Sequence, residues 1–163
     1  MLRLADQHPE VSTFARLYLF AYAFLLRVPS EGLPAVAGGA DLAGEQAVLT
    51  LEEDVLVLRL GRRKNKPGGS ILRRHCWCSS CARSCPVHNL GPMLEHLAPG
   101  EKLFPGISAG AACSMLKRML ESVGVQEASS YRLHDLRRGH ALDLQQSGAF
   151  LLCGTAGLRE CAW

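Results

Sequence analysis

An uninterrupted apolar run over residues 17–26 is the feature that most restricts the fold of this chain. A helix that spans a membrane needs about 18 or more apolar residues, so this run is too short for one. Its residues are apolar on nearly every side of a helix, which indicates a helix buried at the centre of a core. Pro9 favours the start of this helix and Val28-Pro29 favours its end, because a residue that precedes proline disfavours the helical conformation.

Length and composition indicate one globular domain. The chain has 163 residues, of which 48% are hydrophobic and 20% are charged, so we expect one sizeable core and no extensive disorder. Residues 1–10 lack the apolar segment of a secretory signal, and seven cysteines cannot all pair in disulfides. We therefore expect an intracellular protein in a reducing compartment, with no membrane as partner.

The remaining pattern predicts an α+β fold, mainly helical, with a small antiparallel sheet. Residues 47–51 and 55–60 have strand character and are joined by an acidic turn, which predicts a hairpin. A basic stretch over residues 62–70 forms an exposed tip before a third strand at Ile71-Leu72. Residues 32–44 are expected to be a connector. Further helices are expected at residues 90–97, at residues 109–123, and after a cap at Ser129 or Ser130 as far as Gly148.

Positive charge is concentrated in residues 55–98. This segment has eight basic residues and one acidic residue, a net charge of +7, whereas the whole chain has a net charge of +3. Such a block is typical of a protein that binds a phosphate-bearing partner. A solvated basic hairpin is the alternative that charge alone leaves open.

Four cysteines and one histidine are gathered in residues 76–88. Cys76, Cys78, Cys85 and His88 are residues of the types that form a tetrahedral zinc site. The first pair is separated by one residue rather than the usual two, and Cys81 is a fifth candidate ligand. The spacing therefore favours a self-packed loop of reduced thiols over a metal centre. We expect no cofactor, and zinc is the alternative.

His134 and Arg137 are three residues apart in a segment with helical periodicity, so their side chains share one face. A guanidinium can hold two phosphate oxygens, and a neighbouring imidazole can exchange a proton in a reaction. The same spacing also occurs in ordinary amphipathic helices, but its context here, LHDLRRGHA over residues 133–141, is much less common. The pair predicts a site for phosphate chemistry.

Three segments carry a resemblance to a known family: FLLRVPSE at residues 24–31, RKNK at residues 63–66 and LHDLR at residues 133–137. Together they resemble the catalytic domain of tyrosine recombinases, the phage-integrase-like enzymes that break and rejoin DNA, and above all the fungal, transposon-borne Crypton-like branch. The resemblance covers about residues 9–148. It implies a recombinase-like catalytic core over residues 1–148, with the Cys-rich loop 76–88 inside it, and an incomplete C-terminal segment over residues 149–163.

The resemblance implies metal-free phosphoryl transfer on double-stranded DNA. Arg27 and Arg137 would clamp the scissile phosphate and stabilise its transition state. Lys64, with Lys66 as the substitute, would protonate the leaving 5′-oxygen, and His134 would assist proton transfer at the attacking oxygen. Further contacts to DNA are expected from the neighbouring basic residues Arg62, Arg63, Lys66 and Arg138. The family also implies a nuclear protein of a mobile element, and assembly of several copies on DNA is left open.

The nucleophilic tyrosine of the family has no counterpart at the expected place. The only tyrosines are Tyr18 and Tyr22, in the buried first helix, and Tyr131, which precedes His134 although the nucleophile should follow it. We therefore expect a truncated core that forms no covalent link to DNA as written. Two alternatives stay open: a zinc-stabilised module that binds nucleic acid or another partner without catalysis, and a non-functional gene fragment.

Overall fold

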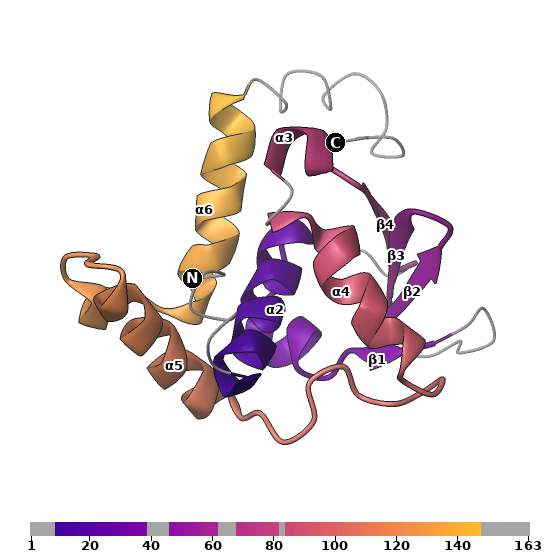
Figure 1. Ribbon diagram of the computed structural model, residues 1–163, viewed down its shortest axis with the longest axis horizontal. Helices are drawn as coiled ribbons and strands as arrows, with labels where there is room; N and C mark the ends of the chain where they lie inside the picture. Colours follow the sequence, from indigo (N-terminus) through magenta and orange to yellow (C-terminus); the bar gives the residue numbers. More distant parts are fainter. Residues whose placement is uncertain (1–8, 39–45, 62–67, 82–83, 148–163) are drawn as a thin grey trace.

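The computed structural model describes residues 9–38, 46–61, 68–81 and 84–147, and it shows a sheet at one side of a group of helices (Figure 1). The elements are, in chain order, α2 (Pro9–Ala23), a π-helical turn (Val28–Gly32), β1 (Val36–Ala37), β2 (Val48–Glu52), β3 (Val55–Leu60), β4 (Ser70–His75), α3 (Cys78–Cys81), α4 (Pro86–Glu95), α5 (Ala109–Ser122), a 3-10 turn (Ala128–Ser130) and α6 (Leu133–Gln146). The α+β class expected from the sequence is confirmed. Among the helices of these residues, none has both the length and the apolar character needed to cross a membrane.

Helix α2 is the centre of the core, as its apolar run predicts. Leu17, Phe20, Phe24 and Leu26 have no exposed surface. Helix α4 contacts both α2 and the sheet, whereas α5 and α6 pack on the other side of α2 (Figure 1). The ring of Phe104, between α4 and α5, lies 5.9 Å from the ring of Phe20, so this connection also closes the core.

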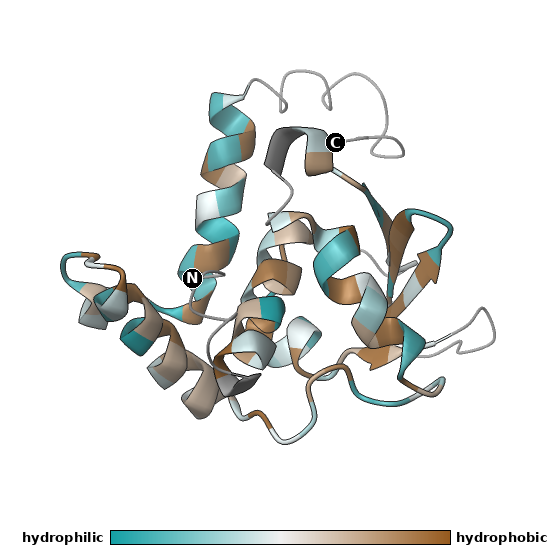
Figure 2. Cartoon of the chain, viewed as in Figure 1, coloured by the Kyte–Doolittle hydropathy of each residue, from teal (hydrophilic) through white to brown (hydrophobic). Residues whose placement is uncertain are grey.

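Helix α6 lies at the edge of the molecule and buries little of its surface. Its ribbon is largely hydrophilic in Figure 2, and Leu133 and His140 are the buried residues among those described on it. A helix of this composition depends on a few anchoring contacts rather than on a broad apolar face.

The sheet in the described part of the chain has four strands in the order β1-β2-β3-β4. The expected hairpin is confirmed, since β2 and β3 pair antiparallel with Glu52 opposite Val55. The third strand is also present, and β4 is longer than the expected pair of residues because it pairs along the whole of β3. The expected antiparallel sheet of three strands is incomplete, however: β1 lies in the segment expected to be a connector and pairs parallel with β2.

Helix α2 ends at Ala23, five residues before the end that Val28-Pro29 predicts. Leu25 has a φ of 55°, a left-handed conformation that is uncommon for leucine. The N–H groups of Leu25 and Leu26 donate to carbonyls three and five residues earlier, at 3.2 and 2.8 Å. This is a Schellman motif without the usual glycine. The chain then runs extended through Arg27 into the π-helical turn.

The helix expected at residues 109–123 is confirmed as α5 to within one residue, but two other boundaries differ. Helix α4 begins at Pro86, four residues before the expected start, because proline suits the first turn of a helix. The expected serine caps of α6 are wrong, since Arg132 is its N-cap and donates its backbone N–H to the carboxylate of Asp135 at 2.8 Å. The hydroxyl of Ser130 donates instead to the carbonyl of Glu127.

Candidate functional site

Two side chains from distant parts of the chain bind the last carbonyls of α2. Arg74 on β4 donates from Nε to the carbonyl oxygen of Ala23 at 2.6 Å. His140 on α6 pairs through Nδ1 with the carbonyl oxygen of Tyr22. The final carbonyls of a helix run short of partners within the helix, so Arg74 satisfies the carbonyl of Ala23, while the carbonyl of Tyr22 accepts from His140 in addition to the N–H of Leu25. They bring β4 and α6 to the turn that precedes Arg27.

Arg74 is a buried cation, with 7% of its surface exposed. Besides its bond to α2 it donates from Nη1 to the carbonyl oxygen of Arg73 at 2.7 Å, and its guanidinium carbon lies 5.4 Å from the ring centroid of Phe24. It forms no ion pair with a described carboxylate. Burial lowers the pKa of Arg74, because the charged form loses hydration. Backbone carbonyls, the negative end of the α2 dipole and an aromatic face therefore stabilise this charge.

His140 forms the other contact with α2. Its ring stacks on the ring of Tyr22 with centroids 4.5 Å apart, and the hydroxyl of Tyr22 donates to the carboxylate of Asp143. Burial lowers the pKa of His140, and the charge of Arg74 acts in the same direction, while the bond to Tyr22 and the charge of Asp143 oppose them. Burial and the bond to Asp143 raise the pKa of Tyr22 to about 12. We conclude that the imidazole is neutral at pH 7 and donates to the carbonyl.

Arg27 has a fixed backbone and an exposed side chain. It is extended, with φ −82° and ψ 110°, directly before the π-helical turn. Its N–H donates to the carboxylate of Glu31 at 2.8 Å, and its carbonyl accepts from the N–H groups of Glu31 and Gly32. Its guanidinium makes no hydrogen bond or ion pair with the described residues. The fold thus holds the position of Arg27 and leaves its charge in solvent.

His134 and Arg137 lie on the first turns of α6. Together with His140 they follow one another at intervals of three residues and form one stripe along the helix. His134 is exposed and Arg137 is partly buried. Arg138 lies outside this stripe and pairs with Asp135 at 3.8 Å. Within the described residues, no hydrogen bond or ion pair joins His134 or Arg137 to Arg27.

The residues expected to form the basic tip belong to the connection between β3 and β4. Leu60 pairs with Ser70, so residues 61–69 form the connection of a hairpin. Gly69 has a φ of 74°, and a Cβ atom there would lie 2.5 Å from the carbonyl oxygen of Leu60, so glycine is required at this end. The basic residues expected to contact DNA at this tip lie outside the described residues: Arg62, Arg63, Lys64 and Lys66.

Two of the eight basic residues in the charged block serve the fold. Arg74 is buried, and Arg59 pairs with Glu52 across the β2–β3 hairpin at 3.0 Å. Arg73, on the other face of β4, is exposed. The charge available to a partner is therefore smaller than the sequence count indicates.

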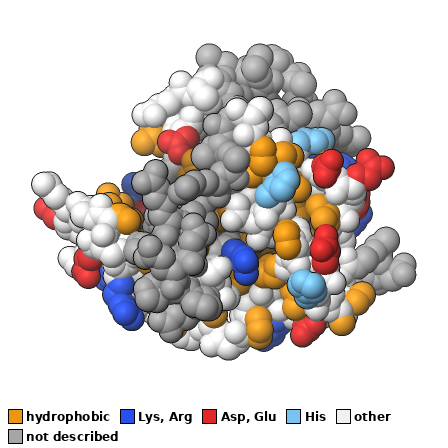
Figure 3. Space-filling view, viewed as in Figure 1, with side chains coloured by type: hydrophobic (Ala, Val, Ile, Leu, Met, Phe, Trp, Pro, Cys, Tyr) orange, Lys and Arg blue, Asp and Glu red, His pale blue; other side chains and the backbone are white. Residues whose placement is uncertain are grey.

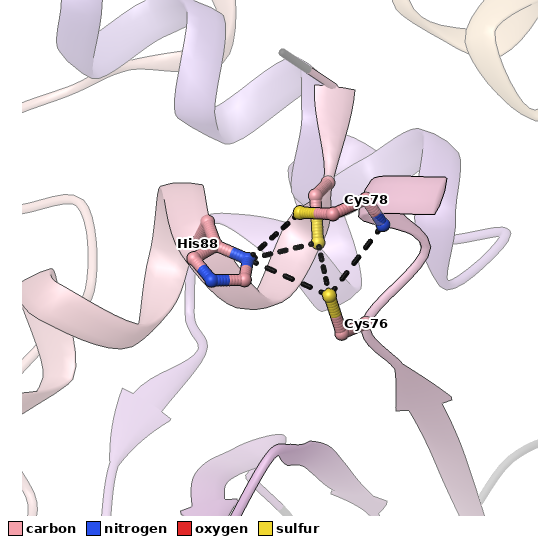
Figure 4. A group of neighbouring side chains, drawn as sticks. Cys76, Cys78 and His88 are labelled. Carbon is pink, nitrogen blue, oxygen red and sulfur yellow. Dashed lines mark hydrogen bonds between the residues drawn. The ribbon is translucent and has the colours of Figure 1, made fainter. Parts of the chain in front are cut away.

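The donor atoms of Cys76, Cys78, Cys85 and His88 form a cluster in which all four lie within 4.8 Å of one another. Nδ1 of His88 lies 3.6 Å from the sulfur of Cys76, 3.1 Å from that of Cys78 and 3.4 Å from that of Cys85. Figure 4 shows the imidazole facing the sulfur atoms. In Figure 3, hydrophobic side chains and histidines share the face of the molecule that carries α4. The structure therefore gathers the four residues of the zinc alternative at one point.

Two thiols of this cluster, those of Cys78 and Cys85, have shifted pKa values. A hydrogen bond with Cys76, followed by burial and the neighbouring Cys85, raises the pKa of Cys78 to about 12. Burial alone would raise the pKa of Cys85, but hydrogen bonds from His88 and from the backbone of Trp77 outweigh it and lower this pKa to about 6. One thiolate is thus already favoured near neutral pH.

Sequence reasoning did not identify Arg74 and His140. The strand register contains one signal for Arg74, since it pairs with Leu56, which has no exposed surface, and paired residues share a face of the sheet. His140 carries no comparable signal, because its partner is 118 residues away. Comparisons of the chain with protein-family models, with curated proteins and with solved structures found no match.

Proposed function

We propose that this chain binds double-stranded DNA as a catalytic core of the tyrosine-recombinase type. In this proposal Arg27 and Arg137 hold one phosphate of the DNA backbone, His134 exchanges a proton beside it, and Lys64 on the hairpin connection reaches the 5′-oxygen. The nucleus is the corresponding compartment. The proposal joins three motifs that are far apart in the sequence.

The observation that carries this proposal is that α6, which bears His134 and Arg137, and β4, which follows the basic connection, both contact the end of α2. Arg74 links this end to β4, the second strand of the basic hairpin, and His140 links it to α6. Arg27 follows four residues after Ala23. Arg137 is one helical turn from His140 on the same stripe. These contacts support a common location for Arg27 and Arg137, whereas Lys64 lies outside the described residues.

The chemistry of these side chains suits a phosphodiester. Two guanidinium groups can each donate two parallel hydrogen bonds to phosphate oxygens, and they stay charged at any relevant pH. A histidine side chain is the group that most often transfers protons to or from a reacting group. His134 is exposed, and Arg27 has its guanidinium in solvent. A DNA backbone can therefore reach both.

A titration of duplex DNA at several salt concentrations tests binding. We expect affinity to fall steeply with salt, by about one log unit per log unit of salt for each phosphate neutralised. Arg137→Ala should lower affinity and reduce the steepness of this dependence by about one. The matched control is Arg118→Ala, an exposed arginine on α5, which should leave both unchanged. The proposal fails if the chain does not bind DNA at low salt, or if the two variants bind equally.

A suicide substrate that traps a phosphotyrosyl link tests whether this chain can form a covalent bond to DNA. The hydroxyl of Tyr18 donates to the buried carbonyl of Ala112 at 2.6 Å, that of Tyr22 donates to Asp143, and Tyr131 precedes α6. Tyr18 is buried away from any phosphate, and a pKa raised to about 12 keeps the phenol of Tyr22 protonated. We therefore expect no covalent adduct on a denaturing gel. A covalent band that Tyr131→Phe removes would show that we have assigned Tyr131 wrongly.

A further inference from the structure

The Cys/His cluster joins the sheet to a helix. Cys76 follows the last residue of β4, Cys78 begins α3, Cys85 is the N-cap of α4, and His88 lies three residues later in the first turn of α4. Residues three apart on a helix share a face, so Cys85 and His88 point to the same side. Two donors thus come from the end of the sheet and two from the helix that packs against it.

We infer that Cys76, Cys78, Cys85 and His88 bind one Zn²⁺ ion in a closed, tetrahedral, structural site. Three sulfur donors and one imidazole nitrogen are a ligand set that zinc prefers, and four protein ligands leave no position for a substrate. This inference does not rest on the proposed DNA-binding function.

Four distances between the donor atoms lie within about 0.5 Å of the edges of a zinc tetrahedron. Zn–S distances of about 2.3 Å and a Zn–N distance of about 2.05 Å give edges of about 3.8 Å between sulfurs and about 3.6 Å between sulfur and nitrogen. The sulfur atoms of Cys76 and Cys85 are 3.7 Å apart, and Nδ1 of His88 lies 3.1–3.6 Å from three sulfurs. A disulfide would require about 2.05 Å between sulfur atoms, so these thiols are not placed as a disulfide.

The surroundings also suit a metal-bound thiolate. The backbone N–H of Cys78 donates to the sulfur of Cys76 at 3.5 Å, and the side-chain amide of Asn89 donates to the carbonyl oxygen of Cys85 at 2.8 Å. The first bond stabilises a negatively charged sulfur, and the second fixes the backbone that carries another ligand. Nε2 of the exposed His88 remains available to solvent.

Binding of the ion would fix the end of β4 to the start of α4. Cys76 is two residues from Arg74, which is bonded to the end of α2. Zinc would therefore stabilise the end of β4, the strand from which Arg74 contacts α2. Zn²⁺ replaces the thiol protons, which are released to solvent, and no oxidation or reduction takes place.

Metal analysis of the full chain, purified under reducing conditions without chelator or metal-affinity tag, is the primary test. We expect about one zinc per chain. Replacement of the ion by Co²⁺ should give the absorption bands of a tetrahedral site with thiolate-to-cobalt charge transfer. A chain that contains no zinc and takes up no Co²⁺ in this geometry would overturn the inference without any variant.

Substitutions identify the ligands. Cys76→Ser and His88→Ala should each abolish stoichiometric zinc, and Cys113→Ser, on the distant helix α5, should retain it. Cys81→Ser should also retain it, because Cys81 is outside the proposed ligand set. Zinc lost in Cys81→Ser and kept in Cys76→Ser would refute this ligand set. Where a variant fails to fold, the cobalt spectrum of the unmodified chain still decides between the outcomes.

Discussion

Replacement of Arg74 by methionine tests whether the buried cation holds β4 on the end of α2. Methionine keeps an unbranched apolar stem of similar length and removes only the guanidinium. The variant loses two charge-assisted hydrogen bonds, at 2.6 and 2.7 Å, each worth about 1.5–3 kcal/mol. It also loses a cation–π contact with Phe24 worth about 1 kcal/mol.

Two effects make the loss of stability smaller than the sum of these three interaction energies. The variant avoids the cost of burying a charge, and the carbonyl of the exposed Arg73 can bind water instead. The carbonyl of Ala23, at the buried end of α2, cannot do so as readily. We therefore expect Arg74→Met to lower the free energy of unfolding by about 2–4 kcal/mol, a fall in Tm of roughly 4–16 °C for a chain of this size.

Urea denaturation followed by circular dichroism measures this change. Arg73→Met is the matched control, since Arg73 is the neighbouring arginine on the exposed face of the same strand, and it should change stability by less than about 0.5 kcal/mol. Equal effects of the two substitutions, or a stability gain in Arg74→Met, would refute the role of Arg74 as the tie between β4 and α2.

Three further predictions concern single contacts. Gly69→Ala should destabilise the hairpin by about 1–3 kcal/mol in urea denaturation, whereas Gly68→Ala, with open space and no positive φ, should change it by less than about 0.5 kcal/mol. Since the folded-state pKa of His140 lies below 6.5, its contribution to stability is present above pH 6.5 and is lost as pH falls from there through the folded-state pKa; His140→Gln should flatten the dependence of Tm on pH below about pH 7. Tyr18→Phe leaves a buried carbonyl without its donor and should cost about 1–2 kcal/mol, whereas Tyr131→Phe, at an exposed tyrosine, should cost almost nothing.

The parts of the fold that the sequence predicts are those that local patterns determine. The β2–β3 hairpin follows from two apolar runs and an acidic turn, and α5 follows from a capping serine, Ser108, and a terminal Gly124 with positive φ. The end of α2 could not be predicted, because Leu25 carries no signal for a left-handed conformation. The end of α2 is held instead by hydrogen bonds from Arg74 and His140, which lie 51 and 118 residues later in the chain.

One candidate site follows from a local pattern in the sequence, and the other depends on tertiary packing. The pair His134 and Arg137 is placed on α6, as helical spacing predicts. The expectation of a self-packed loop of reduced thiols at residues 76–88 remains untested, but the Cys-x-Cys spacing does not predict that three thiols and an imidazole lie within 4.8 Å of one another. Pro86 is a helix-start signal that would have placed Cys85 and His88 on one helix face. The gathering of four donors depends on how α4 packs against the end of β4, which no local pattern contains.

The two bonds to the end of α2 have a consequence for the order of folding during synthesis. The first helix leaves the ribosome early, but Ala23 receives its partner 51 residues later and Tyr22 receives its partner 118 residues later. Contacts of such sequence separation form late, because the intervening chain must first close into a loop. A nascent chain that still lacks α6 would therefore expose α2 before the contact between Tyr22 and His140 has formed. Such an intermediate is a natural target for chaperones, and its lifetime depends on how soon α6 is made.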